Sequence, residues 1–479
     1  MKLKNYINGK FVNAISNKTL NNFNPSTGEQ IQKFPDSDVD DVNVAVKKAK
    51  EAFQIWKTKS IQYRSEFLIN LGSEIKNNAE KIAIAESIDT GKPEWLSKDL
   101  DIPRAAENMF FFGNSIRHFF SEFHNMDNSA FNYTLRQPIG VVGCISPWNL
   151  PLYLLTWKIA PAIATGNTVV AKPSELTPYT AFIFSKLCEK INFPKGVINI
   201  VHGLGKTAGD AIVKHKDVPV ITFTGGTETG KKITRNSASQ LKKISLELGG
   251  KNPNIIFDDA DLDIAIDTSV RASFLNQGQI CLCGSRIYIQ NNIYNKFKKQ
   301  FLEKVNKMKV GDPTLNENDL GSVISKEHLN KILNYINIAK DEGGKILIGG
   351  KQVKIKGKYE KGFFIEPTVI EGLPVSSKVN QNEVFGPVVT LTPFSDEDDL
   401  LKLTNSTQYG LSASIFTQNL NRAHRLASLI DAGTVWINTW LLRDLRVPFG
   451  GMKKSGIGRE GGHSSLHFFT EPKNICIKL

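Results

Sequence analysis

Three residues in separate short segments have the side chains that covalent catalysis at a carbonyl carbon requires. Cys281 ends the segment Gly278-Gln-Ile-Cys281, and a cysteine thiolate is a strong nucleophile. Glu247 is flanked by leucines and followed by glycines, so we expect a desolvated carboxylate with a raised pKa, which suits a general base. Asn149 stands between Pro147 and Pro151, and a rigidly framed amide suits the stabilisation of an oxyanion.

Each of these residues also fits a structural role when it is taken alone. Cys281 could be an inert buried thiol, Glu247 a helix-end acid and Asn149 a turn residue. A zinc site at Cys281 and Cys283 is not predicted, because no second pair of ligands follows at zinc spacing. We therefore expect no metal, and the chemical interpretation of Cys281 depends on the residues that accompany it.

Three turns that follow predicted strands favour a dinucleotide site. Lys172 and Glu175 come just after a strand, where ligands bind in open α/β sheets. A carboxylate there accepts both hydroxyls of a ribose but repels a 2′-phosphate, so Glu175 favours NAD over NADP; a solvated loop acid is the alternative. Gly203-Leu-Gly205 begins a G-x-G-x-x-A pattern, and the glycines of Phe223-Thr-Gly-Gly226 would let a pyrophosphate approach a helix N-terminus.

Strands and helical segments alternate through most of the chain. Apolar runs at 141–145, 167–171, 197–201 and 220–223, with a helix at 180–190 among them, predict right-handed βαβ units and a mostly parallel sheet. Strands at 254–257, 285–290 and 388–394 predict a separate α/β domain. Two helical patterns, 38–88 and 95–112, precede the first sheet.

The end of the sequence alternates apolar and polar side chains. Ile475, Ile477 and Leu479 are too apolar for a free end, and a half-exposed strand is predicted at 131–135. We expect the two segments to form an intersubunit sheet, which predicts a homodimer or homotetramer. Packing of the tail on its own subunit is an equally open alternative.

Composition limits the classes of protein that need consideration. A chain of 479 residues suggests two or three domains, and 41% hydrophobic with 22% charged residues is typical of a globular protein. Five cysteines do not make a disulfide scaffold, and we see neither a signal peptide nor a membrane span, so we expect a cytoplasmic protein without a membrane partner. The net charge of +13 comes from scattered lysines, which favours a basic surface over nucleic-acid binding.

Five segments, in this order and at these spacings, resemble the aldehyde dehydrogenase superfamily over nearly the whole chain. They are Ile145-Ser-Pro-Trp-Asn149, Lys172-Pro-Ser-Glu175, Glu247-Leu-Gly-Gly-Lys251, Gly278-Gln-Ile-Cys281 and Glu383-Val-Phe-Gly-Pro387. The resemblance implies an α/β fold with a Rossmann-like NAD-binding domain, a second α/β catalytic domain and a small β oligomerisation arm. It divides the chain into an NAD-binding domain (1–123 and 144–255), a catalytic domain (256–455) and an oligomerisation segment (124–143 and 456–479).

The same resemblance implies a covalent mechanism. The Cys281 thiolate attacks an aldehyde, the Asn149 amide and the Cys281 backbone N–H hold the oxyanion, hydride passes to NAD, and Glu247 activates water to hydrolyse the thioester. Lys158 resembles the family's site-tuning lysine. Lys172 and Glu175 are expected to hold the adenosine ribose. The full set of expected NAD-binding residues is Ile145, Ser146, Pro147, Trp148, Lys172, Ser174, Glu175, Gly205, Phe223, Thr224, Gly225, Gly226, Leu248, Gly249, Glu383 and Phe385.

Within the superfamily, the chain resembles the 2-aminomuconic and 2-hydroxymuconic semialdehyde dehydrogenases. The resemblance rests on Asp101-Ile-Pro-Arg104, on Leu150 to Lys158 and on Trp440-Leu-Leu-Arg443. It places Arg104 and Arg443 at the substrate, where a guanidinium would match a carboxylate with two hydrogen bonds. The alternatives are surface ion pairs, of Arg104 with Asp99 or Asp101 and of Arg443 with Asp444.

Other functions stay open at this point. The apolar run after Asn149 could line a pocket for betaine aldehyde or a general aliphatic or aromatic aldehyde. A non-catalytic descendant is disfavoured because Cys281, Glu247 and Asn149 are all present. Glu247 also favours hydrolysis over transfer of the thioester to CoA, and a nucleic-acid-binding role, which we do not expect, would show affinity that falls steeply with salt.

Overall fold

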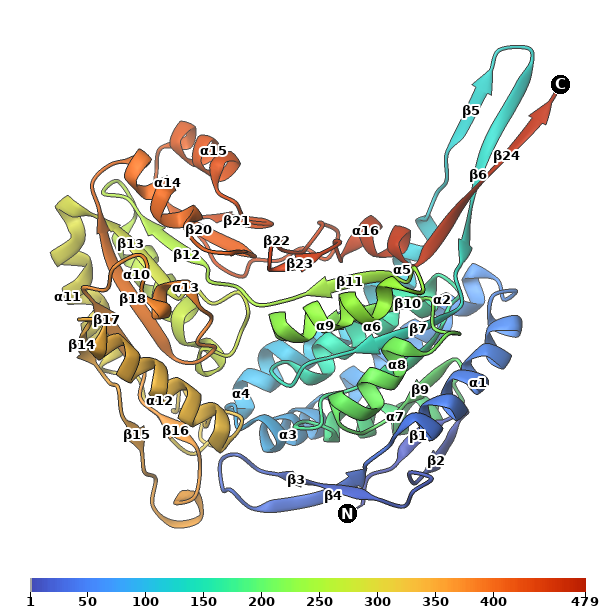
Figure 1. The fold of residues 1–479 in the computed structure, drawn as a ribbon, viewed down its shortest axis with the longest axis horizontal. Coiled ribbons are helices and arrows are strands. Elements are labelled where there is room, and N and C mark those ends of the chain that lie inside the picture. Colours follow the sequence, from blue (N-terminus) through green and yellow to red (C-terminus); the bar gives the residue numbers. More distant parts are fainter. Residues whose placement is uncertain (1) are drawn as a thin grey trace.

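Two β-sheets, each with its own helices, form the body of the molecule (Figure 1). The computed structural model describes residues 2–479. The first sheet has the strand order β2-β1-β9-β8-β7-β10-β11-β23, and its five central strands β9, β8, β7, β10 and β11 run parallel. Its strands are β1 Asn5–Ile7, β2 Lys10–Val12, β7 Val141–Ile145, β8 Thr168–Lys172, β9 Ile198–Ile200, β10 Val220–Thr224, β11 Lys243–Glu247 and β23 Gly456–Ile457. The predicted parallel sheet is confirmed.

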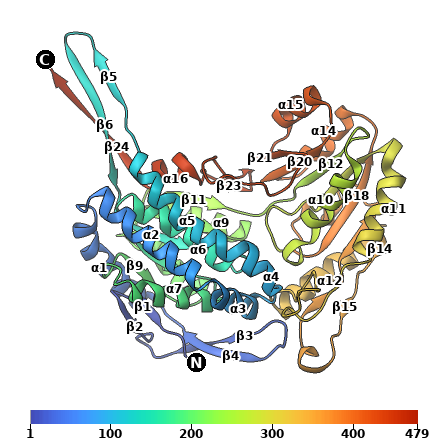
Figure 2. The same cartoon turned by 180° about the vertical axis from the view of Figure 1, so that it is seen from behind.

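Helices cover both faces of the first sheet, because its strands are apolar on both sides. One face packs against α6 (Pro151–Ala164), α7 (Tyr179–Lys190), α2 (Ile61–Asn77) and α5 (Ile102–Ser115), which Figure 2 shows from behind. The other face packs against α1 (Val39–Trp56), α8 (Asp210–Lys214) and α9 (Thr227–Ala238). A buried core therefore lies on each side of the strands that carry the predicted turns.

The long helical pattern at 38–88 is three helices rather than one. Asp38 caps α1, and Ser60 caps α2 by accepting a hydrogen bond from the Tyr63 N–H, so each side chain starts a new helix. Helix α3 (Ala79–Thr90) ends at Gly91, whose φ of 77° lies in the left-handed region. The second pattern, at 95–112, is also divided, into α4 (Glu94–Leu96), a π-helical turn (Ser97–Asp101) and α5.

The second sheet has the order β14-β17-β18-β13-β12-β20-β21, and all its pairings except that of β14 are parallel. Its strands are β12 Pro253–Ile256, β13 Arg286–Gln290, β14 Lys345–Ile348, β17 Thr368–Glu371, β18 Val388–Phe394, β20 Ser412–Phe416 and β21 Thr434–Ile437. Its helices are α10 Leu262–Phe274, α11 Tyr294–Val305, α12 Lys326–Asp341, α13 Lys378–Gln381, α14 Glu397–Asn405 and α15 Leu420–Leu429. The predicted second α/β unit is confirmed.

Short strand pairs lie outside the two large sheets. They are β3 Thr19–Phe23 with β4 Gln30–Pro35, β15 Gln352–Val353 with β16 Phe364–Ile365, and β19 Tyr409–Gly410 with β22 Met452–Lys453. No helix of residues 2–479 is both long and apolar enough to cross a membrane.

A three-stranded arm projects from the body and carries the C-terminal end of the chain (Figure 1). Its strands are β5 (Phe123–Met126), β6 (Ala130–Pro138) and β24 (Thr470–Lys478), in the order β24-β6-β5. The apolar tail therefore pairs with the predicted strand at 131–135 in one sheet, and the role of this sheet between subunits stays a prediction. We predicted that residues 456–469 belong to the arm, but they pack on the body of the molecule. Strand β23 joins the first sheet, and α16 (Gly462–Phe468) buries Leu466 in the core beside that sheet.

Candidate active site

The carboxyl ends of neighbouring parallel strands meet at one edge of the first sheet and face the second unit. Strand β7 continues into Ser146-Pro-Trp-Asn149 and α6, and β10 continues through Gly225-Gly226 into α9. Strand β11 ends at Glu247, next to the end of β10. Ligands of open parallel sheets bind at this edge. The residues that were predicted from separate segments are therefore collected in one cleft.

Two adjoining hollows in this cleft are lined by all of the predicted cofactor-binding residues. The larger, of about 450 Å³, includes Lys172, Glu175 and Gly205, and the smaller, of about 260 Å³, includes Leu248, Gly249, Glu383 and Phe385. Both are lined by Pro147, Trp148, Thr224, Gly225 and Gly226, so they form one continuous groove. Its elongated shape suits a dinucleotide.

The far end of the groove presents an ionised carboxylate. The Lys172 ammonium, which is buried, lies 3.0 Å from Glu175 Oε2. Burial alone would raise the pKa of Glu175, but the Lys172 charge and several hydrogen bonds hold the pKa below its ordinary value. Glu175 is thus ready to accept hydrogen bonds from a ribose diol.

The middle of the groove leaves room for a pyrophosphate. Gly226 is the N-cap of α9, and a Cβ built there would meet no atom within 4 Å, so the helix N-terminus opens into free space. The buried hydroxyls of Ser146 and Thr224 have no hydrogen-bond partner among the described residues. Free donors and an open glycine turn fit NAD in this groove.

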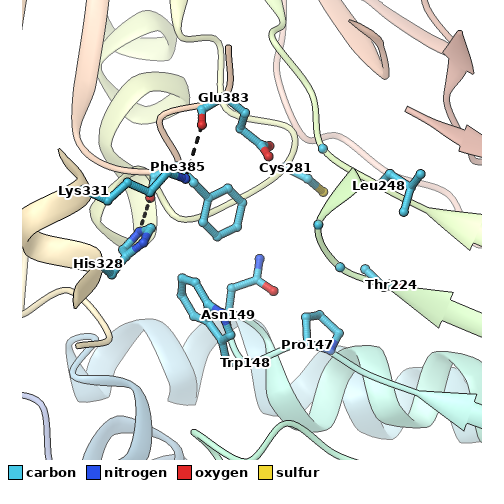
Figure 3. Close-up of a pocket in the computed structure, with 13 residues that line it drawn as sticks. Pro147, Trp148, Asn149, Thr224, Leu248, Cys281, His328, Lys331, Glu383 and Phe385 are labelled. Atoms are coloured by element: carbon cyan, nitrogen blue, oxygen red, sulfur yellow. Dashed lines mark hydrogen bonds between the residues drawn. The ribbon is translucent and has the colours of Figure 1, made fainter. Parts of the chain in front are cut away.

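The opposite end of the groove is an aromatic and acidic pocket (Figure 3). Glu383 Oε1 accepts a 2.9 Å hydrogen bond from the Gly250 N–H, and burial raises the pKa of Glu383 to about 7. Trp148 and Phe385 meet edge to face at 5.3 Å between ring centroids. His328 also lines this pocket and was not among the predicted site residues. Its Nε2 lies 2.7 Å from the Phe385 carbonyl oxygen, and no sequence motif around His328 indicates this contact.

Cys281 stands on a loop with an unusual backbone, directly between this pocket and a second cavity. Asn276, Gln277 and Gly278 have φ values of 53°, 55° and 68°, all in the left-handed region. A Cβ at Gly278 would lie 2.2 Å from the Gly386 carbonyl oxygen, so only glycine fits there. Cys281 lines both the nucleotide pocket and the second cavity, as Thr224 also does. A substrate in the second cavity and a cofactor in the nucleotide pocket would therefore both lie next to the Cys281 sulfur.

Asn149 lies against the same loop, and its side-chain amide points into the nucleotide pocket (Figure 3). Its Nδ2 donates a 2.9 Å hydrogen bond to the Gln279 carbonyl oxygen. One amide hydrogen remains for a ligand, since Nδ2 carries two. The geometry suits an oxyanion site next to Cys281.

Glu247 lies in the second cavity and is almost fully buried. Burial raises its pKa well above the ordinary value, and the nearby Glu460 raises it further, while Lys158 and Arg443 oppose the shift. Its Oε1 has no partner among the residues described. A buried carboxyl with a raised pKa and a free oxygen can take a proton from a thiol or from water.

Lys158 acts on this cavity through Glu460, which the sequence interpretation missed. The Lys158 Nζ lies 2.8 Å from Glu460 Oε1 and 3.1 Å from Thr222 Oγ1. Glu460 lines the second cavity together with Glu247, whereas Lys158 does not reach it. Glu460 is separated from Lys158 by 302 residues, and a lone glutamate near the end of a chain carries no signal of this role.

The thiol of Cys281 is protonated in this arrangement. Burial raises its pKa, and the carboxylates of Glu383 and Glu247 raise it further, whereas Arg443 lowers it. Ionisation therefore needs a neighbouring acceptor, and Glu247 shares the second cavity with the sulfur.

The second cavity contains two arginines from different elements. Arg443 lies with its guanidinium carbon 4.2 Å from the centroid of Phe449 and 4.5 Å from that of Trp157, and it donates to the Tyr153 hydroxyl. Its Nη2 is buried without a partner among the described residues. The guanidinium carbon of Arg104 lies 5.8 Å from the Tyr153 centroid, and burial lowers its pKa.

Neither arginine forms the ion pair that was the alternative to substrate binding. Asp444 binds Arg446 at 2.5 Å, and Asp101 binds Lys92 at 2.5 Å. Within residues 2–479, no carboxylate lies in ion-pair distance of Arg104 or Arg443. The two guanidinium groups thus line the cavity without a close ion pair among the described residues.

Comparison with known proteins agrees with this geometry. The model of the aldehyde dehydrogenase family matches residues 11–475. The chain is 51% identical to 2-aminomuconic semialdehyde dehydrogenase of Danio rerio, over 99% of this chain and 98% of that protein. It is 42% identical to 2-hydroxymuconic semialdehyde dehydrogenase of Pseudomonas sp. (strain CF600), over the full length of both. The NAD+ complex of an aldehyde dehydrogenase from Bacillus cereus superposes with a TM-score of 0.97 at 37% identity, over 100% of this chain and 97% of that chain.

Proposed function

The chain belongs to the aldehyde dehydrogenase family, and we propose that it uses NAD to oxidise a semialdehyde that carries a carboxylate. The substrates best supported are 2-aminomuconic and 2-hydroxymuconic semialdehyde, on which the relatives named above act according to their names. The observation that carries the proposal is the pair Arg104 and Arg443 in the cavity behind Cys281, without a carboxylate partner.

The chemistry of this pair selects an anionic substrate. A half-buried guanidinium without a carboxylate partner favours an anion that enters its cavity, because a guanidinium stays charged. Arg443 is held by three aromatic neighbours and still has a free Nη2 donor. A carboxylate that enters the cavity supplies the missing partner and leaves the other end of the molecule near Cys281. A neutral aldehyde would leave both charges unpaired.

The residues of the site support each step of a covalent mechanism. The Cys281 sulfur adds to the aldehyde carbon after its proton passes to Glu247, and the Asn149 amide and the Cys281 N–H receive the new oxyanion. NAD, when bound in the groove, supplies the oxidant that converts the adduct to a thioester. Glu247 passes the proton it accepted to bulk water and, as the carboxylate, then takes a proton from the water that attacks the thioester. The acid product leaves and the thiol is restored.

The groove residues would hold NAD along its length. Glu175 and Lys172 would bind the adenosine ribose, the N-terminus of α9 the pyrophosphate, and Glu383 the second ribose. Phe385 would pack against the nicotinamide, next to Trp148. The first sheet and its helices then form an NAD-binding domain, and the second sheet forms a catalytic domain that brings Cys281 to the groove.

The arm is proposed to join copies of this chain into a homodimer or homotetramer. Strand β24 is at one edge of the arm sheet, and among residues 2–479 no strand pairs with its other side. Apolar side chains on the arm are exposed, with Phe123 at 64% and Leu479 at 68%. Static light scattering of the full chain tests this assignment, and a monomer at micromolar concentration would contradict it.

A panel of initial rates tests the proposed function. We expect kcat/KM with NAD to be at least tenfold higher for 2-hydroxymuconic semialdehyde than for betaine aldehyde or a simple aliphatic aldehyde. NAD should be preferred over NADP for every substrate. Equal rates for neutral and carboxylated aldehydes would contradict the substrate assignment, and the absence of NADH formation with all of them would contradict the activity.

A further inference from the structure

A buried lysine outside the residues discussed so far touches the backbone of Asn149. The side chain of Lys92 has no exposed surface, and its Nζ donates a 2.9 Å hydrogen bond to the Asn149 carbonyl oxygen. The same ammonium lies 2.5 Å from Asp101 Oδ2 and 3.5 Å from Glu86 Oε1. All three charged side chains are buried, so this cluster is built into the wall of the active site.

The backbone around Lys92 is held in place by close packing. Gly91 ends α3 in the left-handed region, and a Cβ there would lie 2.0 Å from Ser322 Oγ, so no other residue fits. The Lys92 carbonyl accepts a 2.6 Å hydrogen bond from the Ser87 hydroxyl. The Lys92 ammonium therefore reaches Asn149 from a well-packed helix end.

The Asn149 carbonyl is fixed by two donors and its side chain by one acceptor. Asn276 Nδ2 donates to the same carbonyl oxygen at 3.1 Å, in addition to Lys92. The Asn149 amide in turn donates to the Gln279 carbonyl. Both the backbone carbonyl and the side chain of Asn149 are therefore held by hydrogen bonds to other segments of the chain.

The cluster also reaches the substrate side of the site. Asp101 is the last residue of the π-helical turn, and Arg104 follows in the first turn of α5. Glu86 Oε2 accepts a hydrogen bond from the Leu152 N–H at 3.3 Å, at the start of α6. Within this cluster, Lys92 is the side chain that contacts both the Asn149 carbonyl and Asp101, which ends the turn before Arg104.

Stability alone does not explain an ion pair at this position. Two charges taken out of water gain little over well-packed apolar side chains of the same size, and often cost free energy. Burial raises the pKa of Glu86 to about 8, although Lys92 opposes the shift, so this carboxyl is a weak partner for the ammonium. What an apolar replacement would remove is the charge-assisted hydrogen bond to Asn149.

We propose that Lys92 is a positioning residue of the oxyanion site. Its ammonium holds the Asn149 peptide so that the amide hydrogen faces the carbonyl oxygen above Cys281, and its pairing with Asp101 couples that peptide to the turn that carries Arg104. This inference rests on the proposed function, because it assigns to Lys92 a part in the same reaction. Lys92 acts through Asn149 and does not touch the substrate.

The test compares Lys92→Met with the charge-balanced double variant Lys92→Met/Asp101→Asn, which removes both buried charges. The measurement is the rate constant of the first-turnover burst of NADH after rapid mixing with aldehyde. We expect this rate constant to fall about tenfold in both variants. The dissociation constant of NAD and the rate of Cys281 alkylation by iodoacetamide should stay within twofold of wild type. Lys190→Met, at an exposed pair with Glu74, is the matched control and should change none of these values.

A second measurement separates positioning from general loosening of the structure. Asn149→Ala should lower the burst rate constant by about a hundredfold or more, as loss of one oxyanion donor does. Adding Lys92→Met to Asn149→Ala should lower it by less than twofold further, because the positioned group is already absent. Lys92→Arg, which keeps a donor, should recover part of the rate.

Several outcomes would overturn the proposal. A folded Lys92→Met/Asp101→Asn variant with a wild-type burst rate constant would do so. A Lys92→Met/Asn149→Ala variant whose burst rate constant falls by the product of the two single losses would also do so. If both Lys92 variants fail to fold, Lys92 is a folding residue and the proposal is also wrong. Absence of NADH formation by the wild-type chain would instead contradict the proposed function.

Discussion

The side-chain amide of Asn149 donates a 2.9 Å hydrogen bond to the backbone carbonyl of Gln279, two residues before Cys281. The two residues are separated by 130 positions and belong to the two different α/β units. This bond sets the candidate oxyanion donor against the loop that carries the candidate nucleophile. The alignment of the two units is therefore part of the site.

Replacement of the nucleophile should end the reaction. Cys281→Ala is expected to abolish NADH formation, because no other thiol lines the two cavities that meet at this position. Cys283→Ala is the matched control: its thiol is buried two residues away, and the variant should keep most of the activity. Initial rates with NAD measure both, and turnover of Cys281→Ala near the wild-type rate would move the nucleophile elsewhere.

Loss of the proposed general base should stop the reaction after its first half. Glu247→Gln is expected to give one slower burst of NADH, because the Cys281 proton must then leave to water, and after it to accumulate a thioester on Cys281, because water is no longer activated. Intact mass spectrometry detects the adduct. Glu471→Gln, at the exposed pair with Lys243, is the control and should turn over normally. Steady turnover of Glu247→Gln without an adduct would contradict this role.

The two α/β units could be predicted from the sequence, because the patterns of their strands and helices are visible locally. The joint site of Cys281, Glu247 and Asn149 was predicted from the resemblance of five segments to the aldehyde dehydrogenase superfamily. Contacts between segments that are distant in the sequence could not be predicted. Glu460 lies against Lys158 across 302 residues, and no local pattern connects them. Asp444 is next to Arg443 in sequence, yet it binds Arg446, because Arg443 turns inward among aromatic rings. The break between α1 and α2 depends on one N-cap, Ser60, inside an otherwise continuous helical pattern.

The pH dependence of deacylation should respond to Glu460. Deacylation needs Glu247 as the carboxylate, so its rate rises with pH through the pKa of Glu247 and falls on acidification. After burial, the Glu460 charge is the next cause that raises this pKa. Glu460→Gln should therefore lower the pKa of Glu247 and move the acidic limb of the deacylation profile to lower pH. Glu317→Gln, at the exposed pair with Lys309, should leave the limb in place.

Specificity for a carboxylated substrate should depend on the half-buried guanidinium of Arg443. Arg443→Met removes a charge-assisted donor worth about 1.5 to 3 kcal/mol, which corresponds to a rise in KM of roughly tenfold to a hundredfold for a carboxylated semialdehyde. KM for a neutral aldehyde should change by less than about threefold, since it makes no ion pair. Arg446→Met, three residues later at the surface, is the control. Equal losses for both substrates would contradict the role of Arg443.

Selection of NAD should depend on the carboxylate at the far end of the groove. Glu175→Gln removes the charge that repels a 2′-phosphate and leaves the Lys172 ammonium without its partner. We expect kcat/KM with NADP to rise about tenfold, and kcat/KM with NAD to fall. The ratio of the two constants, measured with one aldehyde, checks the prediction. An unchanged ratio would show that another residue selects the cofactor.

The pairing of β24 with β6 has a consequence for the time at which the arm forms during synthesis. Asn132 and Asn474 lie side by side in this pair although 342 positions separate them. At ordinary translation rates, roughly 20 to 70 s pass between the synthesis of the two strands. During that interval β5 and β6 can form only a two-stranded hairpin, which is marginally stable in water. The arm is therefore among the last parts of the molecule to become ordered, long after the segments that carry Asn149, Glu247 and Cys281 have been made.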